Sequence, residues 1–280
     1  MESMRSLSGR ELAAKIRAAT AARAAELAAA GRPPRLAAVT ATADEASAWY
    51  LRSLTTAAAK VGVSCDVIDL TDDASVGIQA ALAELSSNPA VHGIILATPL
   101  PAGLGGLAGL AGAIDPAKDV DGANPVSLGR IMTGLPAFAP ATAEAVVRLL
   151  DHYQIALAGR HAVVVGRSAV VGKPVAHLLL DRDATVTICH SRTRDLAAIT
   201  ARADVLVVAA GRAGLIGPEH VTPGATVIDV GTNATADGAM VGDVDPKVTE
   251  IAGALSPVPG GVGTVTTAVL LGHVTEAASA

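Results

Sequence analysis

The chain has 280 residues, of which 51% are hydrophobic and only 1% aromatic, and its formal net charge is −5. This length allows one large or two ordinary domains with aliphatic cores, and the composition argues against disorder. The acidic balance and the scattered basic residues argue against nucleic acid and anionic membrane as partners. No targeting or membrane-spanning segment is recognisable. We expect a cytoplasmic protein in which Cys65 and Cys189 are reduced core residues.

Helices and strands alternate through the first half of the chain. A Ser-x-x-Glu capping box at residues 8–11 predicts the start of a helix that ends at Gly31. The expected elements after it are a strand at 35–40, a helix at 44–60, a strand at 63–69, a helix at 75–85 and a strand at 92–97. This order predicts parallel strands with crossover helices. A glycine-rich loop is expected from Pro99 to Gly112.

The alternation is interrupted and then resumes. Residues 134–140 hold two prolines without periodicity and are the predicted domain boundary, and a linking helix is expected at 141–153. Strands are then expected at 161–165, 184–189, 204–209 and 225–230, with helices at 170–181 and 194–201. We predict an α/β protein with two doubly wound parallel-sheet domains, the second of the Rossmann type. The first domain would span residues 1–139 plus a C-terminal helix at 264–280, and the second residues 140–263.

A candidate nucleotide loop follows the strand at 161–165. That strand runs directly into Gly166-Arg-Ser-Ala-Val-Val-Gly172, and a helix follows. Glycines allow backbone amides to approach a phosphate, and the helix N-terminus favours negative charge. Ser168 occupies the place of the second glycine in the Gly-x-Gly-x-x-Gly pattern, so the turn alone also fits a plain connection between elements.

The end of the next strand indicates which nucleotide would bind. NAD sites usually carry an acidic residue there, whereas this chain reads His190-Ser-Arg-Thr-Arg194 and has no acid before Asp195. Ser191, Arg192 and Arg167 are suited to donate charge-assisted hydrogen bonds to a 2′-phosphate. The pattern favours NADP over NAD. The alternative is that Arg192 and Arg194 are solvated charges at a helix start, where cations oppose the helix dipole.

Taken together, the motifs resemble the methylenetetrahydrofolate dehydrogenase/cyclohydrolase family. They extend over nearly the whole chain in the family's order. The two most specific stretches are Lys118-Asp-Val-Asp121-Gly122 and Pro257-Val-Pro-Gly-Gly-Val-Gly263. The stretches are Ala46-Ser-Ala-Trp-Tyr50, Lys118-Asp-Val-Asp121-Gly122, Pro99-Leu-Pro101, the loop 166–174, Val227-Ile-Asp229-Val-Gly231-Thr-Asn233, Val241-Gly-Asp243-Val244 and Pro257-Val-Pro-Gly-Gly-Val-Gly263. The resemblance implies two α/β domains, folate on the first and NADP on the second, and a homodimer.

The resemblance also implies roles for single residues. The family's folate-stacking tyrosine falls on Tyr50 and its pterin-holding aspartate on Asp121. The cofactor positions fall on Gly166, Arg167, Ser168, Gly172, Ser191, Arg192, Gly260, Gly261 and Gly263. Taken singly, Tyr50 also fits an ordinary half-buried aromatic, and Asp121 before Gly122 fits an Asx-turn. No spacing of histidines, cysteines and acids predicts a metal site.

Several family positions differ in this chain. Bifunctional members carry a lysine four residues after the tyrosine, on the same helix face, where this chain has Leu54. The glutamine that supports that lysine is replaced in the stretch Ala97-Thr98. Residues 141–143 lack the usual cysteine and proline, and Thr264 replaces a proline.

These differences bear on one of the two family reactions. Hydride removal from the methylene carbon leaves a cation that the substrate's own nitrogens stabilise, so positioning suffices. Hydrolysis of the methenyl ring needs proton transfer, which leucine cannot supply, and Arg52 and Lys60 are not placed to replace the lysine. We therefore hypothesise a dehydrogenase that has lost cyclohydrolase activity. Two alternatives stay open, namely an NADPH-dependent reductase of a non-folate iminium and a catalytically silent ligand-binding relative.

Overall fold

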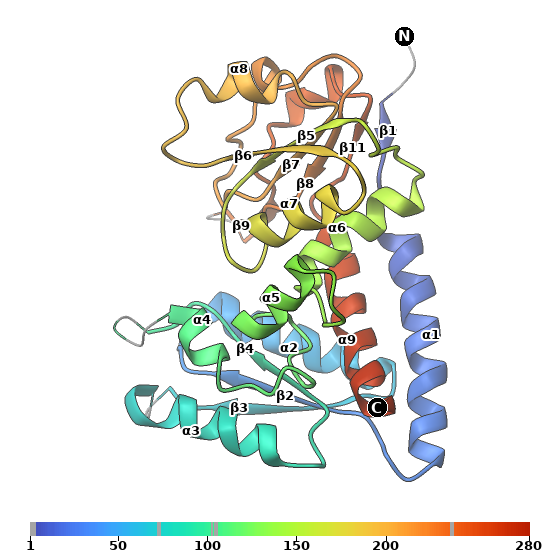
Figure 1. Ribbon diagram of the computed structural model, residues 1–280, viewed down its shortest axis with the longest axis vertical. Helices are drawn as coiled ribbons and strands as arrows, with labels where there is room; N and C mark the ends of the chain where they lie inside the picture. Colours follow the sequence, from blue (N-terminus) through green and yellow to red (C-terminus); the bar gives the residue numbers. More distant parts are fainter. Residues whose placement is uncertain (1–3, 72–73, 102, 104–105, 236–237) are drawn as a thin grey trace. The chain divides into compact units, whose positions relative to one another are not determined.

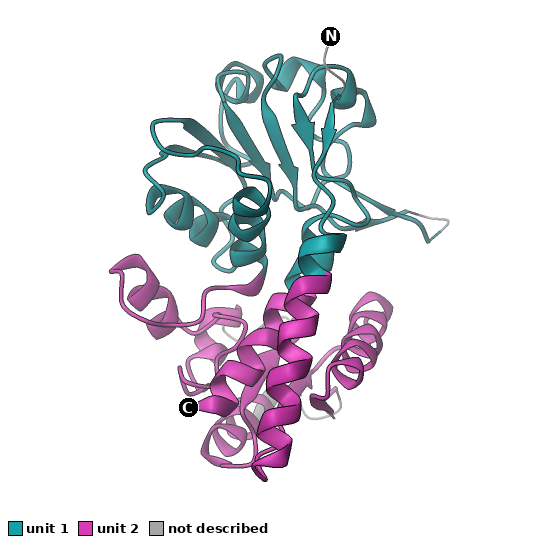
Figure 2. Cartoon of the chain, turned by 90° about the vertical axis from the view of Figure 1, so that its right-hand side faces the viewer, with its two compact units in different colours: residues 1–13, 142–266 teal, residues 14–141, 267–280 magenta. Residues whose placement is uncertain are grey.

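The computed structural model describes residues 4–71, 74–101, 103, 106–235 and 238–280 (Figure 1). The chain divides into two compact units, each built from two separate stretches (Figure 2). Unit 1 comprises the residues up to Ala13 together with Thr142–Thr266, and unit 2 comprises Ala14–Ala141 together with Thr267–Ala280. The boundaries fall inside three helices, α1 (Arg10–Ala29), α6 (Ala141–His152) and α9 (Val262–Ser279).

Unit 1 is built on a parallel six-stranded sheet with the strand order β1-β11-β8-β7-β5-β6. The valine-rich central strands are buried along their length because a parallel sheet is covered on both faces. The strands are β1 (Arg5–Ser6), β5 (His161–Val165), β6 (Thr185–Cys189), β7 (Val205–Val208), β8 (Thr226–Asp229) and β11 (Ala254–Leu255). The remaining elements are α7 (Gly172–Leu180), α8 (Leu196–Thr200), the antiparallel pair β9 (Asn233–Ala234) and β10 (Met240–Val241), and 3₁₀ turns at Pro218–His220 and Pro246–Glu250.

Unit 2 holds a smaller parallel sheet of three strands in the order β3-β2-β4. Strand β2 lies in the centre and is buried from Leu36 to Thr40, whereas β3 lies at an edge and is largely exposed. The strands are β2 (Arg35–Thr40), β3 (Ser64–Asp69) and β4 (Gly93–Leu96), and the helices within the unit are α2 (Glu45–Lys60), α3 (Ala74–Ser87), α4 (Gly106–Ala111) and α5 (Pro125–Met132).

Most expected elements are present, and the differences have local causes. The expected glycine-rich loop contains α4, which is made of Gly, Ala and Leu only, and α5 follows Asn124, whose side chain accepts a hydrogen bond from the backbone N–H of Val126. Cys189 is fully buried, but Cys65 is only partly buried because β3 is an edge strand. No helix in the described ranges is long and apolar enough to cross a membrane.

The N-terminus differs from the expected division, which assigned residues 1–139 to the first domain. Strand β1 instead pairs with β11, with Arg5 opposite Ala254, and so belongs to unit 1. Two-residue strands such as β1 carry no alternation that a sequence pattern can detect. The C-terminal helix α9 does return to unit 2, from Thr267 onward.

Candidate active site

In unit 2, the start of helix α2 is fastened to the end of strand β4. Asp44 caps the helix by accepting from the backbone N–H of Ser47 at 2.9 Å. The Ser47 hydroxyl lies 2.8 Å from the carbonyl oxygen of Thr98, which follows β4. This fixes the helix that carries Tyr50 and Leu54 relative to the strand end that carries Ala97.

Tyr50 and Asp121, predicted from separate motifs, lie close enough for the charge of Asp121 to affect the pKa of Tyr50. The pKa of the Tyr50 hydroxyl is raised, first by desolvation and then by the negative charges of Asp121 and Cys65. The residue as a whole is nevertheless 37% exposed. A partly exposed aromatic side chain beside a carboxylate is suited to stack on a flat heterocycle that also carries hydrogen-bond donors.

Asp121 lies in a loop organised by a neighbouring buried carboxylate. Asp119 is fully buried and accepts from the backbone N–H groups of Ala123 and Asn124, both at 2.9 Å. Desolvation, helped by the charge of Asp119, raises the pKa of Asp121 to about 7, against the opposing effects of His273 and the N–H of Ala141. Asp121 therefore changes charge near neutral pH.

Leu54 is a core residue on the same helix as Tyr50. It is 1% exposed and is among the largest fully buried side chains, and Ala97 is 6% exposed. Neither residue carries a polar side-chain atom. The place where the family's lysine and glutamine are expected is therefore apolar and packed.

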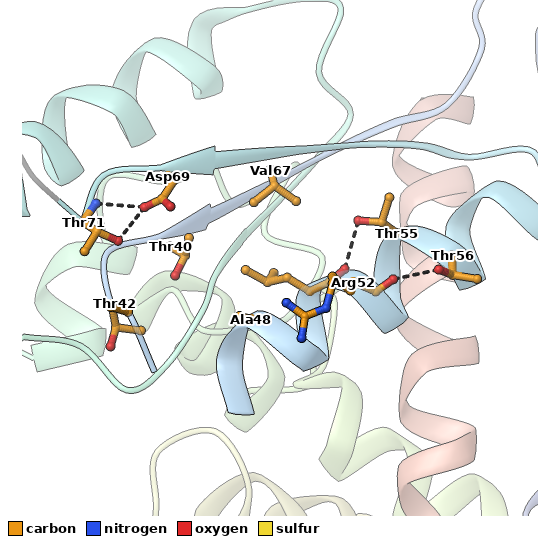
Figure 3. A pocket seen from close by; sticks show the side chains of 11 residues that line it. Thr40, Thr42, Ala48, Arg52, Thr55, Thr56, Val67, Asp69 and Thr71 are labelled. Atoms are coloured by element: carbon orange, nitrogen blue, oxygen red, sulfur yellow. Dashed lines mark hydrogen bonds between the residues drawn. The ribbon is translucent and has the colours of Figure 1, made fainter. Parts of the chain in front are cut away.

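A pocket of about 860 Å³ lies on another side of α2, between that helix and strands β2 and β3 (Figure 3). Its lining includes Arg52 but not Tyr50, Leu54 or Asp121. The hydroxyls of Thr55 and Thr56 in its wall donate to the backbone oxygens of Leu51 and Arg52. Arg52 thus lies away from the face of Tyr50, as the helical spacing predicts.

In unit 1, the loop after β5 has the close backbone packing of a phosphate-binding turn. Gly166 has φ +133°, and a Cβ at this position would collide with the carbonyl oxygen of Ala209 at the end of β7. A Cβ on Gly172 would collide with the carbonyl of Gly166. The Ser168 hydroxyl accepts from the N–H groups of Val171 and Gly172 at 3.1 and 3.3 Å, so this serine stabilises the start of α7. Arg167 is exposed.

The turn after β6 begins beside that loop. Val165 and Cys189 are paired in register, and the N–H of Gly166 donates to the carbonyl of Cys189 at 2.9 Å. The exposed residues Ser191 and Arg192 therefore leave from the strand adjacent to the glycine turn. Because β5 leads to β6 on one side while β7 lies on its other side, this is the switch point where dinucleotides bind in such sheets.

The third glycine segment precedes α9. Gly260 has φ +102°, and a Cβ on Gly261 would lie 2.5 Å from the carbonyl oxygen of Pro257, so both positions require glycine. Gly263 faces open space, so its backbone is not crowded. The N–H of Gly9 donates to the carbonyl of Gly260 at 2.8 Å and ties this loop to the N-terminal segment.

Asp243, which is not among the predicted site residues, holds the loop after β7. Asp243 is fully buried and accepts from the N–H groups of Ala210, Gly211 and Arg212 at 2.7–2.8 Å, and from the Asn233 amide at 2.8 Å. Asp229 in turn accepts from the N–H of Asp243. Asp243, Asn233 and Asp229 belong to two of the motifs in the sequence, but the other three partners of Asp243 lie more than 30 residues away.

Comparison with known proteins places the chain among its relatives. The sequence matches the tetrahydrofolate dehydrogenase/cyclohydrolase catalytic domain over residues 7–121 and the NAD(P)-binding domain of the same family over residues 140–280. The chain belongs to this family. The protein named Bifunctional protein FolD 1 from Saccharopolyspora erythraea is 60% identical over 277 residues, covering 98% of this chain and 94% of the relative. A protein of the same name from Rhodococcus jostii is 59% identical over 276 residues, covering 98% and 93%.

Solved structures of the family agree along the whole chain. The bifunctional FolD enzyme of Campylobacter jejuni has a TM-score of 0.94 at 36% identity, covering 99% of both chains. The Trypanosoma brucei methylenetetrahydrofolate dehydrogenase-cyclohydrolase, solved with NADP and an inhibitor, has a TM-score of 0.93 at 33% identity, covering 100% of this chain and 98% of that one. These matches confirm the family, the α/β fold with a Rossmann-type domain, the NADP-dependent oxidoreductase class and NADP as the cofactor.

Proposed function

We propose that this protein oxidises 5,10-methylenetetrahydrofolate to 5,10-methenyltetrahydrofolate with NADP and does not hydrolyse the product. The proposed lack of hydrolysis rests on Leu54, which is buried on the helix of Tyr50 at the position where bifunctional members have lysine. The close relatives are named bifunctional, so the proposal departs from their names on account of this position.

On the substrate side, Tyr50 and Asp121 would hold the pterin. The partly exposed side chain of Tyr50 would offer a stacking face, and Asp121, in its ionised form, would accept hydrogen bonds from the ring N–H and the amino group of a pterin. These contacts orient the reacting methylene carbon, and orientation is the main contribution the reaction needs, up to about 7–11 kcal/mol. No proton has to be transferred by the protein in this step.

On the cofactor side, the residues present fit NADP. Gly166 and Gly172 leave room for close approach of a pyrophosphate, Ser191 and Arg192 supply donors for a 2′-phosphate, and Gly260, Gly261 and Gly263 would border the nicotinamide. NADP supplies the hydride acceptor when bound. Arg167 would add a second positive charge near the phosphates.

Hydrolysis of the methenyl product makes a different demand. Water must lose a proton as it attacks and a ring nitrogen must gain one, and a positioned acid–base group typically contributes about 10²- to 10⁴-fold. Leu54 and Ala97 have no group that titrates, and Arg52 lines a different pocket. We therefore expect methenyltetrahydrofolate to be hydrolysed no faster with the protein than in buffer alone.

The test uses the purified protein and both folates. With methylenetetrahydrofolate and NADP we expect NADPH and methenyltetrahydrofolate to form in equal amounts, with little formyltetrahydrofolate beyond that formed in buffer. With methenyltetrahydrofolate alone, we expect its absorbance to decay no faster than without protein. Protein-dependent acceleration of that decay would overturn the loss of cyclohydrolase activity while leaving the dehydrogenase intact.

Calorimetry together with these assays separates the two alternatives. A reductase of a non-folate iminium would show no micromolar binding of tetrahydrofolate in calorimetry. A silent relative would bind ligands but turn over neither folate. The identity to folate enzymes along the whole chain supports the folate substrate.

We further propose that the protein works as a homodimer in the cytoplasm. Strand β6 is an edge of the six-stranded sheet, and its Ile188 is 42% exposed, which suits pairing with another strand. One chain has a mass of 27.7 kDa, and sedimentation equilibrium is expected to give twice that mass. A monomer at micromolar concentration would contradict this assignment.

A further inference from the structure

The loop that carries Asp121 is held by a histidine 153 residues further along the chain. Nδ1 of His273, on α9, lies 2.8 Å from the carbonyl oxygen of Val120, the residue between Asp119 and Asp121. A carbonyl oxygen only accepts hydrogen bonds, so Nδ1 must carry the proton and donate it. His273 is 4% exposed, and both residues belong to unit 2.

The imidazole ring is itself fixed by packing. Its centroid lies 4.8 Å from that of the Phe138 ring, with 33° between the planes. Gly122, directly after Asp121, has φ +61°, and a Cβ there would collide with the backbone of residues 138–140. The loop 119–122 is thus held by α9 and by the segment at 138–140.

Asp121 faces charged or titratable groups from several elements. Asp119, in the same loop, opposes its ionisation, and Tyr50 comes from α2. The backbone N–H of Ala141, at the start of α6, and His273 on α9 favour the ionised carboxylate. Of these side chains, His273 is the one that can carry positive charge.

We propose that His273 is a positioning residue for the folate side of the reaction. By donating to the carbonyl of Val120 it fixes the direction in which Asp121 presents its carboxylate, and its imidazole favours the ionised form that accepts from a pterin. This inference rests on the proposed function, because it takes Asp121 to be a substrate ligand.

Two variants separate the hydrogen bond from the charge. In His273→Asn the amide nitrogen takes the place of Nδ1, so the donor stays but the titratable ring is lost. We expect a KM for methylenetetrahydrofolate within about threefold of the wild type at pH 8.5, while the acid limb of kcat/KM moves to higher pH by about half a unit or more. His273→Leu loses the donor as well, and we expect the same KM to rise about tenfold with the KM for NADP within about twofold.

Thr275→Val is the matched control. Thr275 is equally buried on α9, and its hydroxyl donates to the carbonyl of Gly272 within the same helix. We expect its pH profile and both KM values to stay at the wild-type values. The inference would be overturned if the acid limb did not move in His273→Asn, or if both KM values rose equally in His273→Leu. Turnover by the wild type would still support the proposed function in either case. Absence of wild-type turnover would overturn both.

Discussion

The hydroxyl oxygen of Ser47 lies 2.8 Å from the carbonyl oxygen of Thr98, a residue 51 positions further along the chain. The same hydroxyl lies 3.0 Å from the capping carboxylate of Asp44, so one short side chain joins the first turn of α2 to the end of β4. Because α2 carries Tyr50, the placement of the proposed pterin-stacking ring depends on this contact.

Replacing Ser47 with alanine is expected to weaken both stability and substrate binding. The site is 5% exposed, and losing a buried hydrogen bond should lower the free energy of unfolding by about 1 kcal/mol. The measurement is urea unfolding combined with the KM for methylenetetrahydrofolate. Ser53→Ala, at an exposed position of the same helix, is the control and should change neither by a measurable amount. Equal stability losses at the two positions would contradict the assignment.

Restoring the missing lysine should restore hydrolysis. We expect Leu54→Lys combined with Ala97→Gln to accelerate methenyltetrahydrofolate decay at least about a hundredfold over the wild type, the low end of a general acid–base contribution. The cost is a lower melting temperature, because a charge enters a position that is 1% exposed. Leu54→Met with Ala97→Gln is the matched control without a titratable group. If that control hydrolyses as fast as the lysine variant, the amine is not the missing element.

Arg192 is expected to discriminate between the two nicotinamide cofactors. Losing a charge-assisted hydrogen bond of about 1.5–3 kcal/mol to the 2′-phosphate should raise the KM for NADP by about ten- to a hundredfold in Arg192→Ser. The KM for NAD should change less than about twofold, because NAD has no phosphate there. Steady-state kinetics with both cofactors measures this, and Arg194→Ser removes the same charge two residues away as a control. A similar loss in both variants would indicate only a general electrostatic effect.

The raised pKa of Asp121 predicts a pH-dependent stability. Because the folded state binds this proton more tightly than the unfolded chain, the carboxyl group costs stability increasingly as pH rises from about 4 to about 7, and the cost is constant above that. Asp121→Asn should therefore stabilise the protein at pH 8 by up to a few kcal/mol and have little effect near pH 4. Denaturant unfolding at both pH values measures the difference. A stabilisation that is the same at pH 4 and pH 8 would contradict the raised pKa.

Asp243 is expected to be the more sensitive of two aspartates close together in unit 1. In Asp243→Asn the amide NH₂ must face backbone N–H groups, leaving buried donors unpaired at a cost of about 1–3 kcal/mol or more, and the KM for NADP should rise as the loop after β7 loosens. Asp245→Asn is the control, because Asp245 caps the following turn by accepting from the N–H of Lys247, and asparagine caps equally well. Unfolding curves and cofactor titrations of both variants give the comparison.

Long elements with a clear period could be predicted from the sequence. The strand at Arg35–Thr40 and the helix that follows Asp44 are where the pattern places them, because burial and capping are local properties. The two-residue strands β1 and β11 could not be found, since their pairing joins segments about 250 residues apart. Helix α4 consists of six Gly, Ala and Leu residues and shows no polar face, whereas α5 begins with an Asn124-Pro125 start signal that the prediction did not use.

The site was predictable as a set of motifs but not as a network. Tyr50 and Asp121 could be predicted because each matches a family motif, and in the structure Asp121 lies close enough to raise the pKa of Tyr50. The contact of His273 with Val120 could not be predicted, because nothing near either residue in the sequence indicates the other. The same holds for Asp243 and the N–H groups of residues 210–212.

Each end of the chain belongs to the unit formed mainly by the other half of the sequence, and this limits how the chain can be divided into fragments. The first residues belong to the sheet of unit 1 and the last fourteen belong to unit 2. Neither unit is therefore formed by one continuous stretch of the chain. A fragment ending near residue 141 would lack the helix turn that carries His273, and a fragment starting there would lack strand β1. Exchanging either half of the chain with that of a relative as a continuous fragment would therefore disrupt both units.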